Sequence, residues 1–341
     1  MTQHTRKPYR KDAPQTQRLQ HTERAQKRTT RKRRQKLNPD LPIKGVLKPK
    51  CHPRMNHVKT ATEDSCLTPG AVQKLKTYFN QAHPTHAIHS SDPFHIWQDL
   101  HSRLGRSCRG NERCWLNVVP GKEERKRLED ASFVTKMPHE WRDDPDAWLS
   151  NYDIKDVLKD YEEAYPDFVL LGPTTIDFDS VKKRDRTCVD EDLCHFQLHR
   201  LWKQGKRRIG VVFNTDVSTG SGKHWISLFI DLRDKFMMFF DSTGNKVRPQ
   251  IRKFMQKVKR QARHLGIYLK EYDNHGVEHQ MGDTECGMYS LFFIITMLLG
   301  QTDFHKRPMN AREKLDLFLK DFNIPDKYMQ KYREIYFDKG S

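Results

Sequence analysis

Three apolar segments between residues 208 and 241 place the strongest constraint on the fold. Residues 208–214, 223–230 and 235–241 carry large apolar side chains at successive positions, so both faces of each extended segment would be apolar. Strands of this kind lie in the middle of a sheet and are covered on both sides. We therefore predict an α+β fold in which helices flank a central mixed sheet.

Two polar residues mark the ends of the second and third segments. An antiparallel hairpin with Leu232 and Arg233 at its turn places His224 directly opposite Asp241, with Cβ atoms about 5 Å apart. The carboxylate would hold one imidazole nitrogen and leave the other free to act as a base. However, Leu-Arg is not a favoured two-residue turn, and a register shifted by one residue would place the two side chains on opposite faces.

An amphipathic helix and a further strand are expected after this hairpin. One apolar stripe runs along residues 251–265 and consists of Ile251, Phe254, Met255, Val258, Ala262 and Leu265. This spacing is typical of a helix with one buried face, and Gly266 is a typical residue for its end. Residues 267–269 predict a short strand.

A second, more apolar helix is expected to begin near Cys286. Residues 283–285 are Asp-Thr-Glu, which is typical of a helix N-terminus, and an almost entirely apolar run follows to residue 299. The positive end of the helix favours a thiolate, but Asp283 and Glu285 oppose this, so an imidazolium partner is required. Gln280, six residues before Cys286, can donate to a developing oxyanion together with the Cys286 amide.

The set His224, Asp241, Gln280 and Cys286 thus has the order base, orienting carboxylate, oxyanion donor and nucleophile. With its neighbours Trp225, Ser242, Glu285 and Gly287, this set resembles the ubiquitin-like-protein-specific (SUMO/sentrin) cysteine protease family. Its viral relatives include the virion-maturation proteases of adenoviruses, poxviruses and African-swine-fever-type viruses. The resemblance implies a papain-like or adenovirus-protease-like core and cleavage after small residues at Gly-containing sites, and we expect no cofactor.

The resemblance also implies a role for two tryptophans. Trp148 opens the segment Trp-Leu-Ser-Asn, which resembles the helix start that begins the family's catalytic domain. In the family, this residue and the tryptophan after the catalytic histidine, here Trp225, clamp the narrow Gly-containing end of the substrate. Glu285 is a departure, because cellular members usually have Asp before the cysteine, and this weakens an assignment to the cellular SUMO proteases.

Each of these residues also has a structural interpretation when it is taken alone. His224 and Trp225 can pack a strand, Asp241 can form a turn, and Cys286 can be a small buried apolar residue. Their joint order and spacing favour the catalytic interpretation. We assign His279, a rival base, to a role in its loop, and Trp148 is as consistent with a core anchor as with a substrate clamp.

The N-terminal region differs in kind from the rest of the chain. Residues 1–60 contain 18 Lys and Arg against three acids, which supplies +15 of the formal net charge of +18. Such a segment cannot bury a core and is expected to be disordered. Its densest part contains Lys27, Arg28, Arg31, Lys32, Arg33 and Arg34, which predicts phosphate contacts with nucleic acid or a nuclear-localisation signal. A solvated tail without a specific partner is the alternative.

Three regions follow from these patterns. We predict a basic disordered tail over 1–60, a helical arm over 61–140 and a cysteine protease catalytic domain over 141–341. In the arm, one helix is expected near residues 67–75 and a second from Phe94 to Leu104, ended by Gly105. This arm resembles that of the African-swine-fever-type proteases. Residues 310–336 predict polar-faced helices that pack on the outside.

Seven cysteines are present, and two pairs, 108/114 and 188/194, are six residues apart. His195 follows Cys194 directly, but the usual zinc-ligand pairs are closer in sequence, so we predict no metal. We expect no secretory signal, because the sequence shows no apolar signal-peptide region, and the apolar run after Cys286 is shorter than the roughly 20 residues that span a bilayer. We therefore expect no membrane span, a reducing compartment and free thiols.

Three classes of function remain open. The first is a protease that processes viral capsid or core polyproteins, and the second is a deconjugating protease for SUMO or other ubiquitin-like modifiers. The third is a structural protein tethered to nucleic acid, with a vestigial site. The complete set of site residues argues against the third, and the arm and tail favour the first. We expect the protein in the virion and at assembly sites in the host cytoplasm, with the nucleus as an alternative implied by the basic run.

Overall fold

The computed structural model describes residues 35–36, 50–182, 186–303, 305 and 307–338. The described residues from 50 onward belong to one compact unit. The six basic residues predicted to contact nucleic acid, between Lys27 and Arg34, lie outside the described residues. The domain limits expected at residues 60 and 140 stay predictions.

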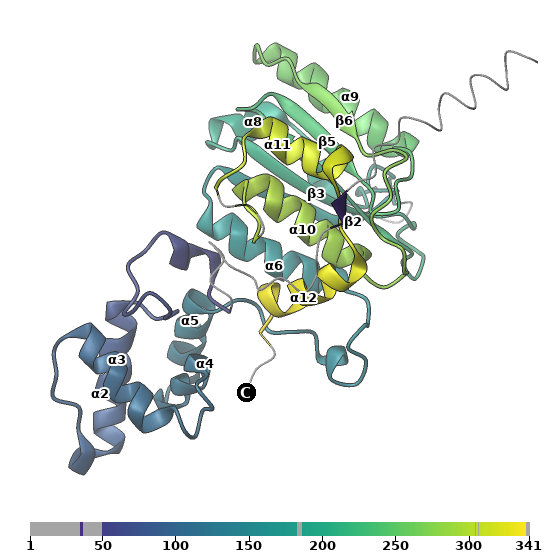
Figure 1. The fold of residues 1–341 in the computed structure, drawn as a ribbon. Helices are drawn as coiled ribbons and strands as arrows, with labels where there is room; N and C mark the ends of the chain where they lie inside the picture. The colour runs from purple at the N-terminus through teal and green to yellow at the C-terminus, as the bar shows by residue number, and fades with distance from the viewer. Residues whose placement is uncertain (1–34, 37–49, 183–185, 304, 306, 339–341) are drawn as a thin grey trace, which may run out of the picture. The chain divides into compact units, whose positions relative to one another are not determined.

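A five-stranded mixed sheet organises the region after residue 140 (Figure 1). Its spatial order is β2 (Phe168–Thr175), β3 (Arg208–Asn214), β4 (Trp225–Asp231), β5 (Phe236–Phe240) and β6 (Lys270–Asp273). The outer pairs β2–β3 and β5–β6 are parallel, and the inner pairs are antiparallel. Every residue of β3, β4 and β5 is buried. The prediction of a central mixed sheet in an α+β fold is confirmed.

Helices cover both faces of this sheet. On one face, α6 (Asn151–Ala164), α10 (Cys286–Leu299) and α12 (Asp326–Tyr336) share a hydrophobic cluster with Phe229 and Phe240. On the other, α9 (Pro249–His264) buries its apolar stripe against Ile226, Leu228 and Ile230. Each fully buried apolar side chain stabilises the fold by about 1.5–3 kcal/mol relative to exposure. The predicted helix over 251–265 is therefore confirmed, together with the face it buries.

The register of the β4–β5 hairpin differs from the prediction by two residues. Ser227 pairs with Phe240 and Asp231 with Phe236, so the turn is the four-residue loop 232–235 and not Leu232-Arg233 alone. One carboxylate oxygen of Asp231 accepts the amides of Arg233 and Asp234, each at 2.9 Å, and Lys235 adopts a positive φ of 57°. Because side chains alternate with a period of two, this shift leaves His224 and Asp241 on the same face.

Two further expectations need correction. The strand expected over 267–269 is displaced, because β6 begins at Lys270, whose amide bonds to the Lys235 carbonyl at 3.0 Å. The C-terminal helices are also less external than predicted. Six residues of α12 are buried against the core, namely Tyr328, Met329, Tyr332, Arg333, Ile335 and Tyr336.

The arm is a separate hydrophobic cluster built from residues between Cys51 and Phe133. Its main helices are α2 (Pro69–Ala82), α3 (Pro93–Leu104), α4 (Glu112–Trp115) and α5 (Lys122–Ser132). The two predicted arm helices correspond to α2 and α3. Asp92 caps the start of α3, and Gly105 follows its end.

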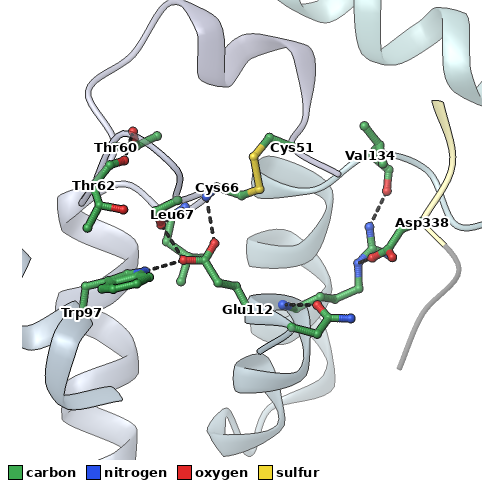
Figure 2. Close-up of a disulfide and its surroundings, with 12 residues drawn as sticks. Cys51, Thr60, Thr62, Cys66, Leu67, Trp97, Glu112, Val134 and Asp338 are labelled. Atoms are coloured by element: carbon green, nitrogen blue, oxygen red, sulfur yellow. Dashed lines mark hydrogen bonds and ion pairs between the residues drawn. A yellow bond between two sulfur atoms is a disulfide. The ribbon is translucent and has the colours of Figure 1, made fainter. Parts of the chain in front are cut away.

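Glu112 holds the arm's loops around its core (Figure 2). One carboxylate oxygen accepts the Ser65 hydroxyl at 2.7 Å and also the Trp97 indole, and the other accepts the Cys66 amide at 2.8 Å. The Cys51–Cys66 disulfide closes the same loop. These contacts tie the start of the arm to α3 and α4.

Arg113 connects the arm to the end of the chain. Its guanidinium lies 2.7 Å from the carboxylate of Asp338, and both side chains are buried. The backbone of Asp338 also pairs with the segment after α5, through hydrogen bonds to Thr135 and Met137. A second contact joins Arg54 to Glu163 of α6 at 3.1 Å.

The expectation of free thiols is wrong for six of the seven cysteines. Cys51–Cys66, Cys108–Cys114 and Cys188–Cys194 are disulfides, and Cys286 is free and buried. Pairing depends on which residues the fold brings together, and linear spacing does not reveal this.

The remaining elements are short. They are β1 (Gln35–Lys36), η1 (Pro53–Asn56), η2 (Pro84–His86), η3 (Leu116–Val118), η4 (His139–Arg142), α7 (Glu191–Cys194), α8 (Leu198–Lys203), α11 (Ala311–Asp316), the π-helical turn η5 (Leu317–Asp321) and β7 (Phe322–Asn323). Within the described ranges, no helix combines the length and apolar character needed to cross a membrane.

Candidate active site

His224 and Asp241 meet at one end of the sheet. His224 immediately precedes β4 and Asp241 immediately follows β5, and antiparallel pairing brings these two ends together. The His224 Nε2 lies 2.8 Å from a carboxylate oxygen of Asp241. With Nε2 engaged, Nδ1 is the nitrogen that can exchange a proton with a neighbouring thiol.

The position of Asp241 is fixed from several directions. The oxygen that meets His224 also accepts the Thr243 amide at 3.0 Å and the Thr243 hydroxyl at 2.7 Å. Asn274 accepts the Asp241 amide at 2.9 Å and donates to its carbonyl at 2.6 Å. Burial acts to raise the pKa of Asp241, but the bonds from His224 and Thr243 outweigh it and hold this pKa below its usual value. Asp241 is therefore a carboxylate at neutral pH.

His224 carries a positive charge in this setting. Burial acts to lower its pKa, but the hydrogen bonds to Asp241 and Cys286 act in the opposite direction and raise it to about 9. The ring is thus an imidazolium at neutral pH, and Asp241 balances its charge. An imidazolium beside a cysteine favours the thiolate, which is the nucleophilic form.

Cys286 is the first residue of α10, as predicted, and lies beside His224. Gly287 lets the segment before α6 approach this helix closely, since a Cβ at Gly287 would lie 3.0 Å from the Cβ of Leu149. The Leu149 carbonyl accepts the Trp225 indole N–H at 2.9 Å. The residue after the histidine, the residue after the cysteine and the start of α6 are therefore packed into one unit.

Gln280 and Ser242 are joined in the loop that leads to Cys286. The Gln280 carbonyl oxygen accepts the Ser242 hydroxyl at 2.7 Å, and its Nε2 donates to the Gly282 carbonyl at 2.8 Å. An amide nitrogen carries two protons, so a second proton can be donated to an oxyanion. His279 has the predicted loop role, because its ring nitrogens contact the Phe318 carbonyl and the Ile324 amide.

Glu285 forms a buried ion pair with Arg333 of α12. The guanidinium contacts the two carboxylate oxygens at 3.1 and 2.9 Å, and the two residues are 1% and 7% exposed. Burial raises the pKa of Glu285 and outweighs the opposing effect of Arg333. Arg333 also donates to the Ala147 carbonyl at 3.2 Å and stacks on Trp141 at 4.2 Å from its ring centroid. The acidic helix start predicted before Cys286 is therefore paired with α12, and Glu285 makes no side-chain cap.

The two tryptophans implied as a substrate clamp occupy different environments. Trp225 is buried, whereas Trp148 is 47% exposed beside Leu149. Tyr152, in the first turn of α6, and Met281, directly after Gln280, are more exposed still, at 71% and 73%. Trp148 is the chain neighbour of Leu149, which contacts both Trp225 and Gly287.

Sequence reasoning missed several residues that hold the site. Asn274 lies in Asp-Asn-His-Gly, a pattern that indicates only a turn. Thr243 belongs to the expected turn after Asp241, and its two bonds to that carboxylate could have been proposed. Arg333 gave no signal, because it is 48 residues from Glu285 in the chain.

The order, spacing and geometry of these residues agree with comparisons to known proteins. Residues 202–337 match the family described as Ulp1 protease family, C-terminal catalytic domain. This chain carries a Ulp1-family cysteine peptidase domain. The match contains His224, Asp241, Gln280 and Cys286, and the resemblance inferred from the residues is confirmed.

Viral proteins are among the relatives of the Ulp1-family domain. A putative thiol protease of Acanthamoeba polyphaga mimivirus is 28% identical over 215 residues, which cover 62% of this chain and 68% of that protein. Two African swine fever virus proteins, one named a cysteine protease and the other a SUMO-1 cysteine protease, are 30% and 32% identical over 154 residues. These alignments cover 43% of this chain and 56% of each relative, little more than half of its length.

A solved structure shares the fold over a longer stretch. The crystal structure of an African swine fever virus protease aligns with a TM-score of 0.55 at 21% identity and covers 86% of this chain and 97% of its own. Residues 141–341 alone cannot supply 86% of this chain. The shared fold therefore includes part of the arm as well as the Ulp1-family domain.

Proposed function

We propose that this protein is a cysteine endopeptidase that cleaves after small residues, at Gly-Gly-x or Gly-x sites, in the capsid or core polyproteins of a large DNA virus. The supporting relatives are the mimivirus and African swine fever virus proteins. The arm adds support, because the fold shared with the African swine fever virus protease extends beyond the catalytic region.

The mechanism follows from the four candidate catalytic residues. The Cys286 thiolate attacks the substrate carbonyl carbon, while the Cys286 amide and Gln280 donate hydrogen bonds to the oxyanion. The His224 imidazolium then gives its proton to the leaving amine, and the peptide bond breaks to leave a thioester. Neutral His224 next accepts a proton from water, whose oxygen attacks the thioester and releases the acid and the thiolate. Asp241 holds the ring and balances its charge.

The burial of the nucleophile carries the proposed preference for small residues. Cys286 is only 1% exposed, and Asp241 is 3% exposed. Leu149 packs on Gly287, the residue after Cys286, and Trp148 is exposed next to Leu149. A bulky side chain beside the scissile bond would collide with Leu149 and Trp148. Glycine has no side chain, so the substrate main chain stays narrow enough to reach the thiolate.

Deconjugation of a ubiquitin-like modifier is the second candidate function. Some relatives carry the name SUMO-1 cysteine protease, and both functions require the same catalytic residues. The Glu285–Arg333 pair does not distinguish polyprotein processing from deconjugation, because it contacts the helix that carries the nucleophile and not the substrate. A substrate comparison is therefore required.

Parallel digestion of two substrates tests the proposal. The full-length protein is incubated with a virion polyprotein that contains Gly-Gly-x sites and, separately, with a SUMO conjugate. We expect cleavage of the polyprotein after glycine, weaker or no release of SUMO, and loss of both activities in Cys286→Ala. Preferential release of SUMO would replace the first function with the second. Cleavage by Cys286→Ala would refute the mechanism.

We also propose that the basic N-terminal residues hold the enzyme on nucleic acid inside the assembling particle, in the virion and at cytoplasmic assembly sites. The concentration of Lys and Arg between residues 27 and 34 supports this, because cationic side chains bind phosphates and release counterions. A nuclear-localisation role for the same run is the alternative.

A further inference from the structure

A cluster of potential metal ligands lies in the connection between β2 and β3, away from the catalytic residues. Cys188 precedes α7, Cys194 ends it, and His195 follows directly. One ligand atom from each of these three residues lies within 4.8 Å of the other two. Among the residues that the structure describes, no other set of three His, Cys, Asp or Glu residues has its ligand atoms this close together. The cluster also lies before residue 202, where the family match begins.

Two distances in the cluster match the edges of a tetrahedral metal site. The Cys188 Sγ is 3.7 Å from the His195 Nε2, and that nitrogen is 3.3 Å from a carboxylate oxygen of Glu191. Zinc bonds of about 2.3 Å to sulfur and about 2.0–2.1 Å to nitrogen or oxygen give tetrahedral edges of about 3.5 Å for S–N and about 3.3 Å for N–O. One imidazole nitrogen therefore faces a sulfur and a carboxylate at the separations that two ligands of one ion would have.

Glu191 is held so that it can complete the set. One of its carboxylate oxygens accepts the Cys188 amide at 2.7 Å, and the other is the oxygen that faces His195 one helical turn later. Lys257 of α9 donates to the Cys194 carbonyl at 2.8 Å. A site with two thiolates and one carboxylate has a net charge of −1 when it holds a divalent cation, and Lys257 partly balances this.

We propose that Cys188, Cys194, His195 and Glu191 bind a zinc ion when the two cysteines are reduced. A dithiol reductant gives two electrons and two protons to the Cys188–Cys194 disulfide, which breaks to two thiols while the dithiol becomes a disulfide. Zinc then displaces one proton from each thiol and bonds to both sulfur atoms. The sulfur atoms separate to about 3.8 Å, the S–S edge of the tetrahedron, and rotation about the side-chain bonds provides this movement.

The zinc ion would keep the β2–β3 connection closed where a disulfide does not persist. This consequence rests on the cytoplasmic location proposed above, because reducing compartments keep thiols reduced. Linear spacing argued against a metal, since five residues separate the cysteines. Cys188 lies outside α7 while Cys194 ends it, so the intervening turn brings the two sulfur atoms together despite that spacing.

Zinc binding to the full-length protein tests the site without any readout of activity. All variants carry Cys286→Ala, so that the catalytic thiol cannot capture zinc, and are reduced with a phosphine. Zinc chloride is added, loose metal is removed, and retained zinc is counted. Cobalt replaces zinc in a parallel sample to detect thiolate-to-metal charge transfer. The matched control is Cys108→Ser/Cys114→Ser, which removes a pair with the same spacing.

We expect one tightly bound zinc per chain in the parent and in the matched control, and none in Cys188→Ser/Cys194→Ser. His195→Ala should weaken zinc binding at least tenfold, on the order of the loss seen when even outer partners of a ligand are removed. Zinc should raise the unfolding temperature of the parent and not that of Cys188→Ser/Cys194→Ser. Equal zinc retention by the parent and that double variant, or equal loss in the matched control, would overturn the proposal and leave the protease function untouched.

Discussion

The protonation state of each candidate catalytic residue depends on a few neighbouring groups. Asp241 stays ionised although it is buried, because Thr243 gives it two hydrogen bonds and His224 a third. His224 is protonated although burial opposes its charge, because Asp241 and Cys286 both favour the imidazolium. These effects depend on one another, so a change in one residue is expected to alter the titration of the whole set.

The Asp241→Asn variant tests this dependence. The pKa of His224 is raised above its ordinary 6.5 to about 9, so the imidazolium is present below pH 9 and is lost as the pH rises through that value. We expect kcat/KM of the parent to fall on the alkaline side near pH 9. In Asp241→Asn, the charge that sustains the imidazolium is gone, so the alkaline limb should move down by more than one pH unit.

The full pH profile of kcat/KM with a peptide substrate measures this shift. At neutral pH we also expect kcat/KM to fall by about tenfold, which corresponds to about 1.4 kcal/mol. The Asn274→Ala variant is the comparison, because it loosens Asp241 without removing its charge and should lower kcat with a smaller shift of the limb. An unchanged profile in Asp241→Asn would show that Asp241 does not control the charge of His224.

Residue order and spacing were sufficient to predict that His224 and Asp241 meet at neighbouring strand ends and that Cys286 begins a helix. The catalytic roles of these three residues and of Gln280 stay predictions. The hairpin register was wrong by two, yet the pair still met, because a shift of two preserves the face. The residues that support the set could not be predicted in the same way. Asn274 and Arg333 act through distant contacts, and their own sequence surroundings resemble an ordinary turn and an ordinary helix.

At the scale of elements, α12 braces the segment that carries the nucleophile. Its first residue, Asp326, accepts the amides of Met281 and Gly282 at 3.1 and 2.8 Å, directly after Gln280. Two turns later, Arg333 holds Glu285 at the start of α10. Both ends of the loop that delivers Cys286 are therefore fixed to one helix, which the sequence alone had suggested to be an outer helix.

Substitution of Arg333 tests this bracing. Arg333→Met leaves the Glu285 carboxyl buried without its partner, and breaking a buried pair of this kind costs about 3–5 kcal/mol. Arg307→Met is the matched control, because Arg307 makes a similar two-point contact with Glu313 on the surface, where solvent screens such pairs and they contribute little to stability. Urea unfolding measures both variants.

Measurement of kcat and KM in Arg333→Met distinguishes a role of Arg333 in positioning Cys286 from a role in fold stability alone. Where Arg333→Met remains folded, we expect kcat to fall more than KM rises, because the Cys286 helix start moves relative to His224. The double variant Arg333→Met/Glu285→Leu removes both buried charges and should recover much of the lost unfolding free energy. A free energy loss in Arg333→Met no larger than that of Arg307→Met would contradict the assigned role.

At the scale of the whole molecule, the arm and the C-terminal helix are connected through one buried ion pair. Arg113 of α4 contacts Asp338, two residues after the end of α12. The helix that braces Gln280 and Cys286 therefore ends on the arm. Through this ion pair the arm is connected to the helix that holds Gln280 and Cys286 in place, although no arm residue is near Cys286 in the sequence.

The basic N-terminal residues provide the last prediction at this scale. If they bind phosphates, removal of residues 1–34 should weaken binding to duplex DNA and also reduce its salt dependence. About six phosphate contacts would contribute a slope of about −5 to a plot of log affinity against log salt concentration. We therefore expect the slope to become less negative by about that amount, both in the deletion and when Lys27, Arg28, Arg31, Lys32, Arg33 and Arg34 are replaced by Gln.

Fluorescence anisotropy with a short duplex, between about 50 and 200 mM salt, measures this slope. Hydrolysis of a free Gly-Gly-x peptide serves as the control, and it should be unchanged in both variants, because the removed charges precede the predicted catalytic domain in the sequence. Cleavage of a polyprotein bound to the same DNA should slow at low salt and converge with the parent at high salt. A slope that does not change would remove nucleic acid from the proposed function, whereas slower hydrolysis of the free peptide would give these residues a role within the enzyme itself.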